Sequence, residues 1–271
     1  MFMCKKLRKH FILVLIILLI PLLSSVIVFA QDSDDSPSTQ DVLKSEGLKS
    51  VDPTKVVQPQ PISNFFARGI DVSKWNGTIN WRAVADSGIQ FAMIRTSFGW
   101  SNWEKFTDRQ LINNINGAKS VGIPIGAYHY SYAKNPQQAI MEADFFINRL
   151  KWTRWEYPAC LDIEDDSQLE LNVQQRTDVA ITFLERVKSA GYYVGIYANL
   201  NWTRYKLDMD RLSPYQLWIA HWNNKCGCTR PYGIWQYTNS GSVPGIETQV
   251  DLNYSYKDYP SIIKSAHLNG F

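Results

Sequence analysis

The sequence predicts an α/β protein whose strands close into an irregular barrel with fewer helices than strands. Eight short apolar runs have the length and composition of strands: Arg68 to Ser73, Phe91 to Ser97, Ile123 to Tyr130, Ala159 to Ile163, Tyr193 to Ala198, Leu217 to His221, Ile234 to Tyr237 and Thr248 to Leu252. Amphipathic helical patterns lie between the early runs, and each ends at a glycine or a loop: Trp81 to Asp86, Arg109 to Ser120, Pro136 to Leu150 and Gln174 to Ala190. This repetition predicts parallel strands with right-handed crossovers. Only loops separate the last three strands, which makes the barrel irregular.

Composition and charge restrict the class of protein. Of the 271 residues, 45% are hydrophobic and 13% aromatic, which is enough for a sizeable core and excludes a disordered or fibrous chain. The net charge is +3, but removing Lys5, Lys6, Arg8 and Lys9 from the 28 lysines and arginines leaves 24 against 25 acidic residues. The body of the protein therefore lacks the basic excess of a nucleic-acid binder, and we expect no nucleic-acid partner.

Residues 1–30 have the pattern of a signal peptide. A basic segment precedes an apolar run from Phe11 to Val28, and Val28-Phe29-Ala30 places small residues where a signal peptidase reads them. We expect cleavage after Ala30 and a secreted, cell-wall-associated protein. An uncleaved anchor holding the protein on the outer face of the membrane remains the alternative, because about 18 apolar residues approach the length that spans a bilayer.

Residues 31–64 are predicted to be a disordered linker, because they contain no tryptophan and are rich in Ser, Asp, Gln and Pro. One folded domain is expected over residues 65–271. The three cysteines of this domain cannot all pair with one another, which excludes a disulfide scaffold. Cys226 and Cys228 are candidates for a tight disulfide, or for a metal site with His221, but their spacing matches no standard zinc pattern. We therefore expect no metal and no cofactor.

Polar and aromatic residues end the predicted strands, which is where a parallel α/β barrel builds its active site. They are Asp71, Tyr128, His129, Tyr130, Asp162, Glu164, Tyr197, His221, Trp222, Gln236, Tyr237, Asp251 and Asn253. An acidic mouth rich in aromatic rings suits a sugar, because rings stack on its CH groups and carboxylates bind its hydroxyls. No glycine-rich phosphate loop, serine elbow or HExxH motif supports another common chemistry.

The sharpest feature is the segment Leu161-Asp162-Ile163-Glu164. Residues two apart on a strand point to the same face, about 6.5 to 7 Å apart at Cα. Two carboxylates in one pocket raise the pKa of one of them, which keeps a carboxylic acid protonated as a general acid near neutral pH. The alternative is a pair of solvated acids at a strand end, a description that suits Asp165 and Asp166.

Other candidate residues have equally ordinary explanations. Packing between barrel and helices is the alternative to sugar stacking for the tryptophans near the strand ends, which are Trp75, Trp100, Trp103, Trp202 and Trp222. His129 and His221 are more often hydrogen-bonded structural residues than bases.

Eight motifs in order resemble glycoside hydrolase family 25, the Chalaropsis-type lysozymes, over about Arg68 to Asn253. They are Gly69-Ile70-Asp71-Val72-Ser73 with Trp75, Phe91-Ala92-Met93-Ile94-Arg95, Gly126-Ala127-Tyr128-His129-Tyr130, Leu161-Asp162-Ile163-Glu164, Tyr197, Leu217-Trp218-Ile219-Ala220, Ile234-Trp235-Gln236-Tyr237 and Val250-Asp251-Leu252-Asn253. The resemblance implies a single catalytic domain, a flattened TIM-like barrel of the β5α3 type with a groove at the carboxyl end. It also implies hydrolysis of the β-1,4 bond between N-acetylmuramic acid and N-acetylglucosamine in bacterial peptidoglycan.

The same resemblance assigns roles to residues. Glu164 would be the general acid and Asp162 the second carboxylate, while Asp71 and Asp251 complete the acidic cluster. We expect five further residues to contact the glycan: Tyr128, Tyr130, Tyr197, Trp222 and Gln236.

The sequence leaves more than one catalytic mechanism and more than one function open. Asp162 either attacks the anomeric carbon or orients the substrate's 2-acetamido group as the nucleophile, which we favour; an inverting route stays open. A non-catalytic glycan-binding barrel and a chitinase-like enzyme are the competing functions. A monomer is expected.

Overall fold

A computed structural model describes residues 66–100 and 103–271, and the side chains of these except Trp103 and Glu104. The predicted signal peptide or anchor at 1–30 and the predicted linker at 31–64 lie outside the described residues. Within the described ranges, no helix combines the length and apolar character that crossing a membrane requires.

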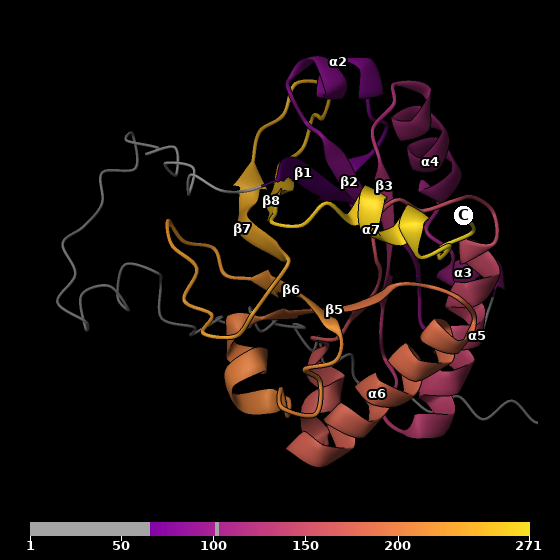
Figure 1. The fold of residues 1–271 in the computed structure, drawn as a ribbon, viewed down its shortest axis with the longest axis vertical. Coiled ribbons are helices and arrows are strands. Elements are labelled where there is room, and N and C mark those ends of the chain that lie inside the picture. The colour runs from indigo at the N-terminus through magenta and orange to yellow at the C-terminus, as the bar shows by residue number, and fades with distance from the viewer. Residues whose placement is uncertain (1–65, 101–102) are drawn as a thin grey trace, which may run out of the picture. The chain divides into compact units, whose positions relative to one another are not determined.

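Eight strands close into one barrel in chain order (Figure 1), which confirms the predicted fold. They are β1 (Ala67–Val72), β2 (Phe91–Phe98), β3 (Ile125–Tyr130), β4 (Ala159–Asp162), β5 (Val194–Asn199), β6 (Gln216–Ala220), β7 (Ile234–Gly241) and β8 (Val250–Ser255). Neighbours from β1 to β7 are parallel. Strand β8 is antiparallel to both β7 and β1, so the expectation of parallel strands throughout is wrong for the strand that closes the barrel.

The four predicted helices are present, and α5 and α6 lie side by side against the barrel (Figure 1). Their bounds are α2 (Trp81–Asp86), α4 (Leu111–Ser120), α5 (Pro136–Leu150) and α6 (Val173–Ser189). The amides of Asn80, Asn135 and Asn172 cap the first turns of α2, α5 and α6, because a side-chain oxygen accepts from a backbone N–H that has no partner within the helix. Five short elements were not predicted: η1 (Lys74–Asn76), α3 (Trp103–Phe106), η2 (Asp166–Glu170), η3 (Trp202–Lys206) and α7 (Tyr259–Ser265).

Side chains inside the barrel close the end where the parallel strands begin. The Phe91 ring stacks on Tyr157 with ring centroids 4.4 Å apart, and α7 adds Tyr259 and Ile263 to this inner cluster. Gly69 of β1 makes room for the Phe91 ring, since a Cβ at residue 69 would lie 2.4 Å from Phe91 Cε1. Packing thus fills this end of the barrel and leaves the opposite end for a site.

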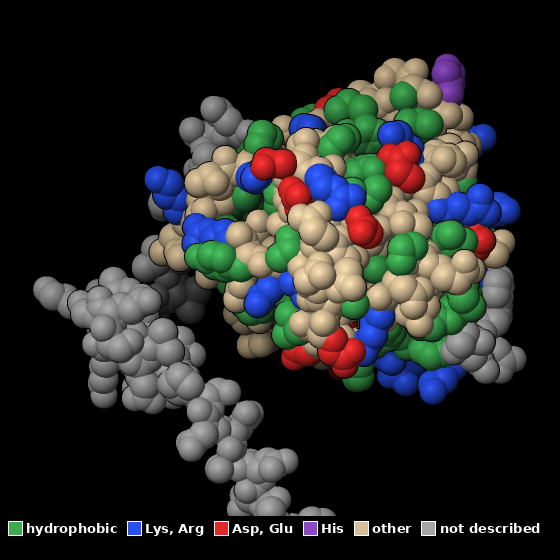
Figure 2. Space-filling model, turned by 90° about the horizontal axis from the view of Figure 1, so that it is seen from below, with side chains coloured by type: hydrophobic (Ala, Val, Ile, Leu, Met, Phe, Trp, Pro, Cys, Tyr) green, Lys and Arg blue, Asp and Glu red, His purple; other side chains and the backbone are tan. Residues whose placement is uncertain are grey.

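Charges of both signs are interspersed on the face that Figure 2 shows. Surface ion pairs join neighbouring elements, including Arg186 Nε to Asp144 Oδ1 at 2.7 Å between α6 and α5. Such exposed pairs contribute at most about 1 kcal/mol each, so the stability of the fold rests on the barrel and its packed helices.

Candidate active site

A cavity of about 290 Å³ opens at the carboxyl ends of the parallel strands. We call it the catalytic groove. Its lining residues are Asp71, Ser73, Trp75, Arg95, Tyr128, Tyr130, Asp162, Glu164, Tyr197, Trp218, Trp222, Gln236, Asn239 and Asp251. All nine residues predicted to catalyse or to bind substrate are in this set, so the fold brings them together.

The reversed direction of β8 explains how Asp251 reaches the groove. Asp251 is the second residue of β8 and lies opposite Asp71 in the register of β1 with β8. Because β8 runs against its neighbours, its first residues lie where β1 ends. Asp251 therefore enters the site from the start of its strand rather than from its end.

Asp162 ends β4 and is 5% exposed. Its Oδ1 atom is buried without a hydrogen-bond partner. Burial raises the pKa of Asp162 well above its ordinary value, and the negative charges of Glu164 and Asp71 raise it further, whereas Arg95 lowers it. A carboxyl group that resists ionisation and has an unused acceptor atom is therefore turned toward the groove.

Glu164 is less buried than Asp162, and Asn199 Nδ2 donates to its Oε2 at 3.4 Å. Burial raises the pKa of Glu164, the hydrogen bond from Asn199 lowers it, and the charges of Asp71, Asp165 and Asp166 raise it. The net shift favours the protonated form closer to neutrality, which is the state that a general acid needs.

Two amides orient Asp71. Its Oδ2 accepts from Gln236 Nε2 at 2.9 Å and from Asn253 Nδ2 at 2.8 Å. Burial raises the pKa of Asp71 well above its ordinary value, as does the charge of Asp251, while the two amide hydrogen bonds lower it.

Burial also raises the pKa of Asp251 to about 6. Asp71 and Asp251 lie opposite each other in the register of β1 with β8, and the negative charge of Asp251 disfavours ionisation of Asp71 beside it.

Aromatic residues form the floor and continue the same network. The Trp218 ring meets Tyr128 and Tyr197 edge to face, with centroids 5.8 and 4.8 Å apart. Tyr197 Oη and Trp222 Nε1 both donate to Gln236 Oε1, at 3.0 and 2.9 Å. The carbonyl oxygen of the Gln236 side chain therefore accepts two hydrogen bonds. These bonds fix the orientation of the amide, so that its nitrogen points to Asp71.

Sequence reasoning assigned no site role to several residues of the groove. Trp218 Nε1 donates to Asn253 Oδ1 at 2.8 Å, which orients the amide that Asn253 offers to Asp71. Both lie in quoted motifs, and Trp218 is two residues from the end of β6, in phase with the inner face. Alternation along the strand was thus a usable signal for Trp218 and also for Ser73, which is two residues after Asp71. Arg95 lies in a quoted motif that assigned it no role, and Asn239 lies outside the quoted motifs.

The tryptophans divide between rim and core. Trp75 and Trp222 line the groove with exposed fractions of 70% and 56%, as rings that stack on sugars would. Trp202 is buried among packed residues, and Trp100 is half-buried outside the groove lining. The side chain of Trp103 lies outside the described part of the chain.

The two histidines make structural hydrogen bonds. His129 is buried beside Phe146 and Phe183, with Nδ1 2.8 Å from Ser97 Oγ. His221 Nδ1 accepts from the Gly227 N–H at 2.9 Å. Neither is among the residues that line the groove.

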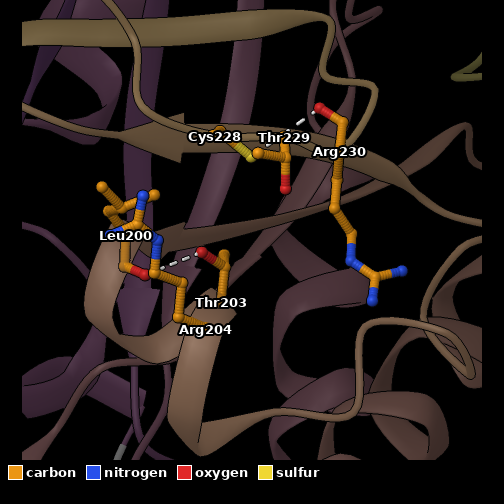
Figure 3. A pocket seen from close by; sticks show the side chains of 6 residues that line it. All are labelled: Leu200, Thr203, Arg204, Cys228, Thr229 and Arg230. Atoms are coloured by element: carbon orange, nitrogen blue, oxygen red, sulfur yellow. Dashed lines mark hydrogen bonds between the residues drawn. The ribbon is translucent and has the colours of Figure 1, made fainter.

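The segment with Cys226 and Cys228 lies by a smaller cavity of about 220 Å³, shown in Figure 3. Both cysteines are free thiols, and the Cys228 S–H donates to the carbonyl oxygen of Arg230 at 3.7 Å. Among the described residues, no group of three or more His, Cys, Asp or Glu side chains is arranged to hold a metal ion. Neither the tight disulfide nor the metal site is therefore formed in this structure.

A barrel with four carboxyl groups in one groove, two of them two residues apart at a strand end, has the paired acids that a glycoside hydrolase uses. Residues 70–246 match the family described as glycosyl hydrolases family 25. The chain belongs to this family, as its motifs predicted, and it is a glycoside hydrolase.

Several of the named relatives are lysozymes. The chain is 31% identical over 226 residues to lysozyme M1 of Streptomyces globisporus, covering 77% of this chain and 73% of that protein. The crystal structure of the bacterial lysozyme from Streptomyces coelicolor matches with a TM-score of 0.59 at 28% identity, covering 74% of this chain and 96% of that one. The modular autolysin LytC of Streptococcus pneumoniae, solved with a synthetic peptidoglycan ligand, matches with a TM-score of 0.63 at 27% identity, covering 70% of this chain but 46% of LytC. This chain thus spans less than half the length of LytC.

Proposed function

We propose that this protein is an exported lysozyme that hydrolyses the β-1,4 bond between N-acetylmuramic acid and N-acetylglucosamine in peptidoglycan. The observation that carries the proposal is the pair Asp162 and Glu164, held at the end of β4 in a groove with two further carboxyls. The lysozymes among its relatives support peptidoglycan as the substrate.

Glu164 acts as the general acid in this proposal. Its proton passes to the glycosidic oxygen as the bond to the anomeric carbon breaks, and N-acetylglucosamine leaves with a free hydroxyl group. The raised pKa of Glu164 supplies the protonated form for this step. After the step, the Glu164 carboxylate takes a proton from the water that completes hydrolysis, which releases a new muramic-acid reducing end.

Asp162 orients the nucleophile of the substrate. Its buried and unpartnered Oδ1 accepts the N–H of the 2-acetamido group of muramic acid, which turns the acetamido oxygen toward the anomeric carbon. The acetamido oxygen bonds to the anomeric carbon from the face opposite the leaving oxygen, whose bond breaks. Water later displaces the acetamido oxygen by attacking from the face that the leaving group vacated. The configuration at the anomeric carbon is therefore retained.

The decisive experiment compares wild-type protein with Glu164→Gln on purified peptidoglycan. We expect muramic-acid reducing ends, identified by borohydride reduction and mass spectrometry, from the wild type. At least a hundredfold fewer are expected from the variant, because removal of a general acid costs roughly 10²- to 10⁴-fold in rate. Thermal unfolding of both proteins checks that the substitution leaves the fold intact. Glucosamine reducing ends would identify a glucosaminidase, and cleavage of chitin as fast as peptidoglycan would identify a chitinase. Binding of glycan without new reducing ends would identify a non-catalytic binding module.

The same digestion, followed by NMR in its first minutes, tests the role of Asp162. The β-anomer should appear first, and an initial α-anomer would exclude the assisted route in favour of inversion. For export, intact-mass analysis of the protein from culture medium should show a chain beginning after Ala30. Recovery in the membrane fraction with residues 1–30 attached would establish the anchored form instead.

A further inference from the structure

A second cavity, of about 260 Å³, extends the catalytic groove. Its lining residues are Lys74, Trp75, Arg95, Phe98, Tyr130 and Tyr132, and three of these, Trp75, Arg95 and Tyr130, also line the groove. The two spaces therefore adjoin each other across a shared wall of Trp75, Arg95 and Tyr130. We call the second space the cationic extension.

Lys74 gives the extension a positive charge that forms no salt bridge with any acidic side chain described in the structure. Its Nζ lies 4.7 Å from the ring centroid of Trp75 and 4.9 Å from that of Phe98. In the described part of the chain, none of the salt bridges formed by lysine side chains involves Lys74. The backbone N–H of Lys74 donates to Asp108 Oδ2 at 3.0 Å, which fixes where the side chain begins.

Arg95 brings a second cation to the same wall. Its Nε donates to Asp108 Oδ2 at 2.9 Å, its side chain is 11% exposed, and its Nη2 is buried without a partner. Asp108 thus pairs with Arg95 and with the backbone at Lys74, and it leaves the Lys74 ammonium unpaired. The carboxylate of Asp165 accepts from Tyr130 Oη at 3.0 Å and from the Ser167 N–H and forms no salt bridge with Lys74, although its negative charge acts on Tyr130 and Tyr132 in the wall of the extension.

The groove and its extension therefore differ in charge. The catalytic centre holds Asp71, Asp162, Glu164 and Asp251, and those of them that are ionised repel an anionic group on the substrate. The extension carries one unpaired cation between aromatic walls. An anion attached to a bound glycan is consequently drawn to the extension, with its apolar parts against Trp75 and Phe98.

We propose that the cationic extension is a subsite for a carboxylate carried on the lactyl ether substituent of a muramic-acid residue. The carboxylate belongs either to the peptide stem or, in glycan without stems, to the lactyl group itself. Lys74 makes the direct contact, and Arg95 strengthens the positive potential behind it. This inference rests on the proposed lysozyme function and adds recognition of the substituent to recognition of the sugar chain.

The test compares wild type, Lys74→Met and Lys74→Arg on three substrates, with Lys151→Met as the matched control. Residue 151 is an exposed lysine at the end of α5, so its substitution changes net charge equally without touching the groove. The substrates are native peptidoglycan, peptidoglycan with its carboxyls capped by methylamide formation, and glycan stripped of stems by an amidase. The stripped glycan keeps only the lactyl carboxylate.

We expect K74M to lower kcat/KM on native peptidoglycan by roughly tenfold, the effect of losing one charge-assisted contact. K74R and K151M should stay within about twofold of wild type. On capped peptidoglycan the loss should shrink to about twofold or less, because the carboxylate is absent. A loss that persists on stripped glycan shows that the lactyl carboxylate freed by the amidase also binds in the subsite, and a loss that disappears there restricts the subsite to the carboxylates of the stem.

Two results would overturn the subsite. One is an equal loss by K74M on native and capped substrate, which would make Lys74 a mere support for the aromatic wall. The other is no loss on native substrate. If K74M does not fold, the wild type alone tests the subsite through the ratio of its kcat/KM on native to that on capped peptidoglycan. Raising the salt concentration from about 0.05 to about 0.5 M must lower this ratio, because salt screens the electrostatic attraction. Failure of the wild type to release muramic-acid ends would instead reject the lysozyme function itself.

Discussion

At the scale of single residues, the site depends on groups that hold carboxyls as much as on the carboxyls themselves. Asp71 receives two amide N–H groups, and the amide of Gln236 is in turn fixed by Tyr197 and Trp222. All nine site residues predicted from the sequence line one groove, because the ends of strands in a barrel meet at one rim. Trp218 received no site role and Asn253 was named only as a strand-end residue, because the hydrogen bonds that connect them to Asp71 join strands far apart in the sequence.

Gln236→Met should reduce activity without unfolding the protein. Methionine fills a similar volume but offers Asp71 no donor and leaves Tyr197 and Trp222 without their acceptor. Each buried polar group left unsatisfied costs about 1–3 kcal/mol, so we expect kcat/KM on peptidoglycan to fall at least tenfold. The pH at which activity declines on the alkaline side should fall, because loss of the hydrogen bond from Gln236 keeps Asp71 neutral to higher pH and so removes a negative charge that raises the pKa of Glu164.

Steady-state rates between pH 4 and 8 measure both effects. Gln137→Met is the control, since residue 137 is exposed on α5 away from the groove, and it should leave rate and pH profile unchanged. An unaltered pH profile in Gln236→Met, together with full activity, would show that the amide network does not orient Asp71.

At the scale of elements, periodicity located all eight strands and the four main helices, but not strand direction. The pattern of apolar residues is the same for a strand read either way, so β8 was assigned the direction of its neighbours. The length of its connection held the missing information. Only the residues between Gly241 and Val250 join β7 to β8, and a parallel crossover needs a dozen or more. The short turns and α7 escaped because they lack a repeating pattern.

Gly69 in β1 is expected to resist substitution because of its neighbour rather than its backbone. A methyl group at residue 69 would lie 2.4 Å from Phe91 Cε1, inside a packed ring pair with Tyr157. Gly69→Ala should therefore lower the free energy of unfolding by about 1–3 kcal/mol, the usual cost of overpacking.

Urea denaturation of G69A, Phe91→Leu and the double variant measures this. Because leucine removes the ring that the new methyl meets, the double variant should be more stable than the sum of the single effects predicts, by at least about 0.5 kcal/mol. Strict additivity would locate the cost in the backbone instead.

At the scale of the whole molecule, the catalytic groove lowers the stability of the domain as pH rises toward neutrality. Burial raises the pKa of Asp251 from 3.8 to about 6 and raises that of Asp71 and Asp162 more strongly. A carboxyl whose pKa is higher in the folded than in the unfolded state stabilises the fold while both states are protonated. For Asp251 this stabilisation is complete below about pH 4 and is lost as pH rises through about 6.

Surface acids act in the opposite direction. Hydrogen bonds to the backbone N–H of Arg211 and to the Ser261 hydroxyl lower the pKa values of Asp208 and Asp258, so their contribution is lost as pH falls below about 4. The two groups together place the maximum of stability in mildly acidic solution, near pH 4 to 5, rather than at neutrality.

Asp251→Asn isolates the contribution of the groove, because asparagine keeps the shape and can donate a hydrogen bond to Asp71. Scanning calorimetry of wild type and variant at pH 4.5, 6 and 7 should show a wild-type Tm that falls with pH and a variant Tm that falls less. At pH 7 the variant should melt roughly 2–4 °C higher, the shift that 1 kcal/mol produces in a domain of this size, and the difference should vanish toward pH 4. A constant difference at every pH would attribute the change to packing. A variant that is more stable at pH 7 and yet loses lysozyme activity would show that the fold tolerates these buried charges because catalysis requires them.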